Sequence, residues 1–308
     1  MRWAGSALAL ALLCACGNLS NEDIAFVEAI PRKEQLHVEV PNGSTAQPLC
    51  SLGGADIYAN AKATGLSINS GVDNILSLVD SIRTVTPTTR DDDSRTWGPF
   101  PDQKHAGVVI KVVMVRELDQ TLTPWRWIYS IAASRPPGGY LPILEGEFFG
   151  PQARNGIGRI TFHFENSTSL GMNDDPNAPN FPARFFYDLS GDPKTISLDL
   201  TAGVNAFGLV SFDYFFAGYA DGHGQFDFAV PDPKSGCTID ISTFFTAQGA
   251  GRDVFRLRCG STLSSDVKQC WDTAGCLTFI DDPFAFTPIC GLLKPCLLGD
   301  SSLCPPGL

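Results

Sequence analysis

Basic side chains and long apolar runs are both scarce in this sequence. Lys and Arg number 22 against 33 Asp and Glu, which gives a net charge of −11 at pH 7. That shortage of positive charge argues against a basic patch for nucleic acid or anionic lipid headgroups. The most apolar internal run, GVVIKVVMV at 107–115, contains Lys111 and is far shorter than the roughly 20 residues of a spanning helix. We therefore expect neither a nucleic-acid partner nor an internal membrane span.

Recognisable catalytic and metal-binding motifs are also missing. The chain has no G-x-S-x-G, H-E-x-x-H, G-x-G-x-x-G or Walker motif. It has no C-x-x-C, and its four histidines lie far apart, so no ligand set has the usual metal spacing. The S-x-x-K string at 265–268 lacks its companion motifs, and prolines interrupt the acidic loop at 173–180. We expect no metal, no cofactor and no enzyme activity, with an unrecognised envelope enzyme as an alternative.

The N-terminus has the features of an export signal. Arg2 precedes an uncharged segment at 4–13, which is too short to span a bilayer but suits the apolar core of a signal peptide. The string L-C-A-C at 13–16 resembles the bacterial lipobox. The chain is therefore expected to be exported rather than membrane-spanning.

The lipobox resemblance implies a lipid anchor. Residues 1–15 would be the signal peptide, and Cys16 would carry the diacyl group, with palmitate among its acyl chains. In the enterobacterial sorting rule, Asp after the modified Cys retains a lipoprotein in the inner membrane; the chain has Gly17 there, so the rule implies the outer membrane. We expect residues 16–35 to be a lipid-anchored tether, although the IAFVEAI segment within them could also pack.

Eight cysteines remain after the anchor, and an even number in an exported chain predicts up to four disulfides. They are Cys50, Cys237, Cys259, Cys270, Cys276, Cys290, Cys296 and Cys304. Two alternating segments, 236–245 and 253–259, flank a turn with two glycines, and pairing them about Gln248 places Cys237 opposite Cys259. Opposed residues in an antiparallel pair lie within disulfide reach, so this bridge is predicted. The other six cysteines allow 15 connectivities, with Cys270–Cys276 and Cys290–Cys296 as one local option.

The body of the chain has the pattern of a β-sheet with one helix. Val72, Ile75, Leu76, Val79 and Ile82 have helical spacing, which predicts an amphipathic helix near 70–85 with an N-terminal cap at Ser70. About ten alternating segments follow between 107 and 259, joined mostly by short turns.

Two hairpins have a register that satisfies both faces of the sheet. Pairing about 190–193 puts Tyr187 opposite Ile196 and Phe185 opposite Leu198. Pairing about 150–156 puts Leu144 opposite Phe162 and Glu147 opposite Arg159. A one-residue slip would destroy these matches, so the register is predicted as well as the strands.

These patterns predict a mainly β fold. We expect one domain at 36–260: a large bent antiparallel meander of about ten strands, half-open or closed as a barrel, with the helix packed on it. Residues 261–308 lack regular alternation and are expected to form a cysteine-rich cap around one end.

A row of aromatic side chains on two later strands is the candidate ligand face. The residues are Phe212, Tyr214, Phe216, Phe226 and Phe228. They alternate with outward Asp213 and Asp227, so they face inward as ordinary core or as the lining of an apolar cavity. The helix-then-meander order with a lipid anchor resembles the half-barrel lipid carriers of bacterial envelopes, a likeness of architecture only.

Several segments between 140 and 280 also resemble uncharacterised lipoproteins of myxobacteria. They include GEFFG, GRITFHF, FFYDLSGDPKTISLDL, GQFDFAV and QCWDTAGC. The resemblance implies an envelope lipoprotein and carries no activity with it. Our leading hypothesis is a non-catalytic structural or interaction module of the cell envelope, attached to the membrane by its lipid. The alternative is a carrier of a lipid or other apolar ligand inside the curved sheet.

Overall fold

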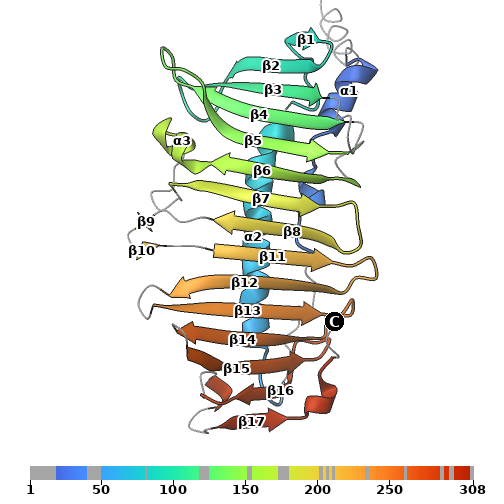
Figure 1. Ribbon diagram of the computed structural model, residues 1–308, viewed down its shortest axis with the longest axis vertical. Helices are drawn as coiled ribbons and strands as arrows, with labels where there is room; N and C mark the ends of the chain where they lie inside the picture. The colour runs from blue at the N-terminus through green and yellow to red at the C-terminus, as the bar shows by residue number, and fades with distance from the viewer. Residues whose placement is uncertain are drawn as a thin grey trace, which may run out of the picture.

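The protein folds as a single antiparallel meander. The computed structural model describes residues 19–39, 50–80, 82–117, 125–150, 155–172, 180–200, 204–205, 208–209, 212–232, 236–259, 262–284, 288–290 and 295–305. Fifteen strands form one sheet in chain order, and β9 and β10 pair with each other separately. The mainly β class is confirmed, with more strands than the ten expected (Figure 1).

The strands of the first half are β1 (Thr89–Asp91), β2 (Ser94–Pro101), β3 (Val109–Glu117), β4 (Arg126–Ser134), β5 (Leu141–Phe149), β6 (Ile157–His163), β7 (Pro182–Asp188) and β8 (Lys194–Leu200). The later strands are β9 (Val204–Asn205), β10 (Gly208–Leu209), β11 (Phe212–Gly218), β12 (Gly224–Asp232), β13 (Cys237–Phe245), β14 (Gly251–Cys259), β15 (Thr262–Trp271), β16 (Leu277–Asp282) and β17 (Cys296–Gly299). The helical elements are α1 (Asn21–Glu28), η1 (Lys33–Gln35), α2 (Asp56–Asp80), α3 (Phe164–Ser169), η3 (Pro288–Cys290) and η4 (Ser301–Leu303).

Both predicted hairpin registers are confirmed. Tyr187 lies opposite Ile196, and Leu144 lies opposite Phe162. The Glu147 carboxylate pairs with Arg159 at 2.7 Å on the opposite face of the sheet. Apolar pairs on one face and charge pairs on the other therefore fix the register here.

The helix under the sheet is longer than the sequence pattern predicts. α2 begins at Asp56 rather than near Ser70 and ends at Asp80. Its first half has Ala61 on the buried side, and so small a side chain gives no hydrophobic periodicity to detect. At 25 residues the helix is about 37 Å long, and it runs across successive strands of the sheet (Figure 1).

β15, β16 and β17 continue the sheet, so the described residues 262–271, 277–282 and 296–299 do not form the expected cap. The apolar–polar alternation of β15 is interrupted because Gln269, a polar residue, occupies an inward position. Gln269 is only 1% exposed. A register shift between Cys270 and Trp271 interrupts the pattern further.

The segment expected as a tether is folded from Ser20 onward. Phe26, Ile30 and Leu36 are 0–2% exposed and belong to the main core. The α1 residue Asp23 is fully buried and accepts a hydrogen bond from Arg95 at 2.7 Å. Burial raises the pKa of Asp23, but hydrogen bonds from Arg90, Ser20 and Arg95 outweigh that effect and hold it well below the usual range. The overall polar composition of 16–35 did not indicate this packing, because its buried apolar residues are confined to α1 and the two residues after it, Ala29 and Ile30.

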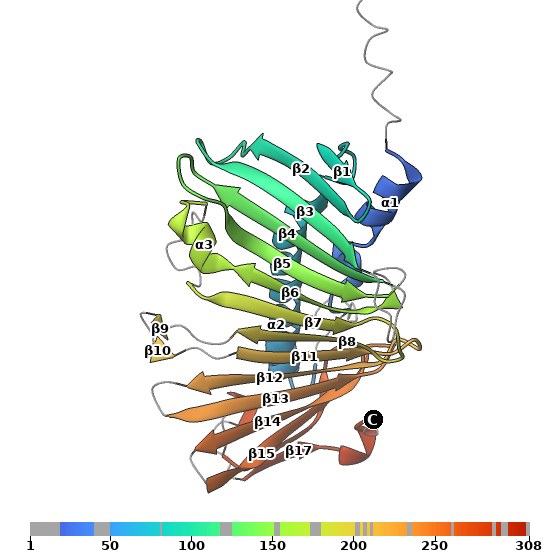
Figure 2. The ribbon, with the colours of Figure 1, turned by 45° about the horizontal axis from the view of Figure 1, so that its top comes forward.

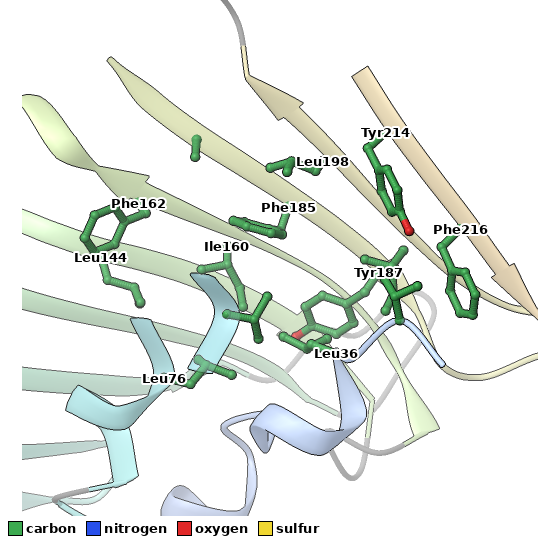
Figure 3. Packing of buried hydrophobic residues seen from close by; sticks show 14 of the residues in the cluster. Leu36, Leu76, Leu144, Ile160, Phe162, Phe185, Tyr187, Leu198, Tyr214 and Phe216 are labelled. Atoms are coloured by element: carbon green, nitrogen blue, oxygen red, sulfur yellow. The ribbon is translucent and has the colours of Figure 1, made fainter. Parts of the chain in front are cut away.

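Side chains from the sheet and from the N-terminal elements meet in one core. We call the face of the sheet toward α2 the inner face and the other the outer face. Leu76 of α2 and Leu36 lie over inner-face residues such as Ile160 and Tyr187 (Figure 3). The sheet is visibly bent around this layer (Figure 2). α2 therefore occupies the space that a carrier protein would need to leave open.

Candidate functional site

The predicted ligand face lies in this core. Tyr214 and Phe216 on β11 face Phe228 and Phe226 on β12 in register. Their exposed fractions are 2%, 3%, 8% and 0% in that order, and all four belong to the cluster that contains α2. The Phe212 side chain lies outside the described part of the structure. Side chains this buried are ordinary core, which is one of the two interpretations that the sequence left open.

A buried polar row crosses the same face near the start of α2. Thr243, Asp253 and Gln269 lie side by side on β13, β14 and β15 and are at most 1% exposed. The Thr243 hydroxyl donates to the Asp253 carboxyl at 2.6 Å. Burial raises the pKa of Asp253 to about 8, while hydrogen bonds from Thr243 and from the Tyr58 backbone N–H act in the opposite direction. Asp253 therefore satisfies a free N–H in the first turn of α2, a structural role that the sequence analysis missed.

The disulfides agree in part with the expected pairs. Cys237–Cys259 is confirmed, with the two residues directly opposed in the hairpin. Cys290–Cys296 is the local bridge that was one option. Cys270–Cys276 is wrong, because the chain instead forms Cys270–Cys304 and Cys50–Cys276. Four disulfides indicate an oxidising, non-cytoplasmic location, and Cys16 lies outside the described residues.

The outer face carries a groove over β7, β8, β11, β12 and β13. We call it the outer-face groove; its volume is about 590 Å³, and its side chains include Phe186, Ser197, Asp199, Asp213, Phe215 and Asp227. The row Phe186–Ser197–Phe215–Asp227 crosses four strands in register. The short Ser197 side chain between the two phenylalanines leaves the hollow. In Figure 1 this face of the sheet is toward the viewer, and α2 lies behind it.

Two large apolar side chains in this groove are in contact with solvent. Phe186 is 43% exposed and Phe215 is 39% exposed. Each has a neighbouring phenylalanine in the chain, Phe185 and Phe216, that faces the core instead. Successive strand residues point to opposite faces, so a Phe-Phe pair places one ring on the outer face, where Phe149 and Phe244 are contacted by arginines and Phe186 and Phe215 are exposed. The Phe-Phe dipeptides therefore indicate an aromatic ring on the outer face, but the same dipeptide at 148–149 and 244–245 means that they do not locate the groove.

The groove is also strongly acidic. Four of the described residues that line it are aspartates, and no described lining residue is basic. Asp213 lies directly opposite Asp199 on the neighbouring strand, and Arg184 lies opposite Asp199 on its other side. Asp240 is paired with Arg258 at the rim. Asp227 accepts a hydrogen bond from the Gln225 amide at 2.5 Å. The arrangement combines negative charge with exposed aromatic rings, which is suited to binding a cation.

Other site chemistry is sparse in the described residues. They contain no group of three or more His, Cys, Asp or Glu side chains placed to hold a metal ion. The acidic loop at 173–180 lies almost wholly outside the described residues. Lys268 and Asp266 of the S-x-x-K string lie on β15, where Asp266 pairs with Arg256 at 2.7 Å. The described part of that string is therefore part of the sheet surface.

Comparisons with models of known families, with curated proteins and with solved structures found no match. Among the helices that the structure describes, none combines the length and the apolar character required to cross a membrane.

Proposed function

We propose that this protein is a lipid-anchored module of the cell envelope that binds a partner through the outer-face groove. The groove carries this proposal, because Phe186 and Phe215 are exposed on a sheet face whose opposite side is sealed by α2. Large exposed apolar side chains in a hollow bordered by polar groups are typical of interaction sites. No enzymatic step is proposed.

The lipobox resemblance and the disulfides support the location. Four disulfides require an oxidising compartment, and a lipid on Cys16 would hold the module at the outer membrane. Ser20, which caps α1, lies only four positions after Cys16. Four residue steps reach at most about 14 Å. The α1 end of the sheet would therefore lie nearest the bilayer.

The groove would then be held away from the membrane. From β2, which lies near α1, to β8, the sheet advances by six strand positions, or about 29 Å at roughly 4.8 Å per strand. A partner could reach the groove without touching the lipid headgroups. This position favours an interaction function over a membrane-surface one.

Site-specific photocrosslinking in living cells tests the proposal. We expect benzoylphenylalanine at position 215 to give a discrete covalent adduct after irradiation. The matched control is position 100, because Phe100 on β2 is 38% exposed against 39% for Phe215 and lies outside the groove. Absence of an adduct at position 215, or the same adducts at both positions, would contradict an interaction through the outer-face groove.

A further inference from the structure

The exposed rings and the carboxylates of the groove lie on the same face of neighbouring strands. Phe186 and Phe215 flank Ser197 across two strand spacings, which is roughly 10 Å. Asp227 lies beside Phe215 in the same row, and Asp213 lies two residues before Phe215 on the same strand and face. A cation over a phenylalanine ring is attracted by the ring's negative face. It could reach a carboxylate at the same time.

The same chain already uses this combination elsewhere. The Arg126 guanidinium lies 5.8 Å from the centre of the Phe149 ring, and it hydrogen-bonds Glu147 at 2.6 Å. Arg252 lies over Phe244 at 4.8 Å. In the outer-face groove the aromatic and acidic members are present, and the described lining supplies no basic one. Asp199 and Asp240 already face Arg184 and Arg258. A ligand with a basic side chain would complete the combination at Phe215.

We propose that the outer-face groove binds a basic peptide segment of a partner protein, with its arginine or lysine side chains over Phe186 and Phe215 and against Asp213 and Asp227. This inference rests on the proposed interaction function and names the chemistry of the partner. The groove extends over five strands, or about 19 Å, which accommodates roughly six residues of extended peptide. The net charge of −11 would accelerate the approach of a basic partner.

The charge of the groove disfavours other occupants. A second copy of this chain would bring its own excess of acid against the aspartates. Anionic lipid headgroups would be repelled for the same reason.

Fluorescence anisotropy with a defined peptide tests this inference. The probe is a fluorescein-labelled seven-residue peptide of alternating glycine and arginine, added to the full-length protein in a non-ionic detergent. We expect saturable binding that weakens as salt is raised. The Asp213→Asn/Asp227→Asn variant should bind roughly tenfold more weakly, and Phe215→Ala roughly threefold more weakly. A peptide with glutamate in place of arginine should not bind.

The matched control is Glu39→Gln/Asp92→Asn, which removes the same charge from two exposed positions outside the groove. It should bind within about twofold of the unmodified protein, because only long-range charge is lost. The thermal midpoint of Asp213→Asn/Asp227→Asn should not fall, because the substitution removes one of two opposed charges. That readout separates lost binding from lost folding.

Two results would overturn the inference. One is equal weakening in the groove variant and in the control, which would make the binding a property of net charge alone. The other is no binding of the arginine peptide to the unmodified protein. If the position 215 crosslink still formed in that case, the interaction function would stand and only the basic chemistry of the partner would be wrong. Loss of both would remove the proposed function as well.

Discussion

The free energy of unfolding is expected to fall by roughly 5 kcal/mol between pH 4 and pH 8 through Asp253 alone. Burial raises the pKa of this carboxyl to about 8 in the folded protein, against about 3.9 in an unfolded chain. Above pH 4 the unfolded state releases the proton that the folded state retains. The contribution to stability is therefore complete below pH 4, declines as pH rises, and levels off above pH 8.

Asp253→Asn isolates this effect from the other titrating groups. The amide keeps the shape of the side chain and an oxygen that can accept from Thr243 and from the Tyr58 backbone, but it does not ionise. Urea unfolding of both proteins from pH 4 to pH 9 gives the difference in unfolding free energy at each pH. That difference should shift in favour of the variant by a few kcal/mol as pH rises. A difference that stays constant would mean that Asp253 titrates normally in the folded protein.

Removing the Cys50–Cys276 bridge has the second large expected effect. The two cysteines are 226 residues apart, and the chain-entropy treatment of a loop that long gives about 5 kcal/mol. The bridge also joins the segment before α2 to the β15–β16 turn. Beside it, the Ala55 N–H donates to the Gly275 carbonyl and the Leu277 N–H donates to the Gly53 carbonyl. Cys50→Ser/Cys276→Ser should therefore lose a large part of the total stability, which is 5–15 kcal/mol in typical proteins.

The short bridge Cys290–Cys296 provides the internal comparison. It closes a separation of only 6 residues, for which the same treatment gives about 2 kcal/mol. Denaturant midpoints of both double-serine variants, with the remaining bridges verified by peptide mapping, measure the contrast. Equal losses in the two variants would mean that the long bridge does not act through loop closure.

The sequence predicted the parts of the fold where both faces of a strand carry information. The 185–198 hairpin has apolar pairs on one side and Arg184 across from Asp199 on the other, so only one register satisfies it. The Cys237–Cys259 bridge followed from the same reasoning.

The predictions failed where buried residues are small or polar. Ala61 lies against the core without extending the hydrophobic pattern of α2, and buried Gln269 concealed a strand. The groove was missed because Phe186 and Phe215 have the composition of core residues. Their exposure follows from the position of α2, which local pattern does not specify.

The central claim is that an anchored module has a sealed interior and acts through its outer face. Native mass spectrometry of the full-length protein purified from its host tests that claim most directly. We predict the mass of the chain from Cys16 onward with covalently attached acyl groups, unchanged by collisional activation. A lipid bound beyond the covalent anchor and released on activation would contradict the sealed interior and favour a carrier with Tyr214, Phe216, Phe226 and Phe228 as its lining.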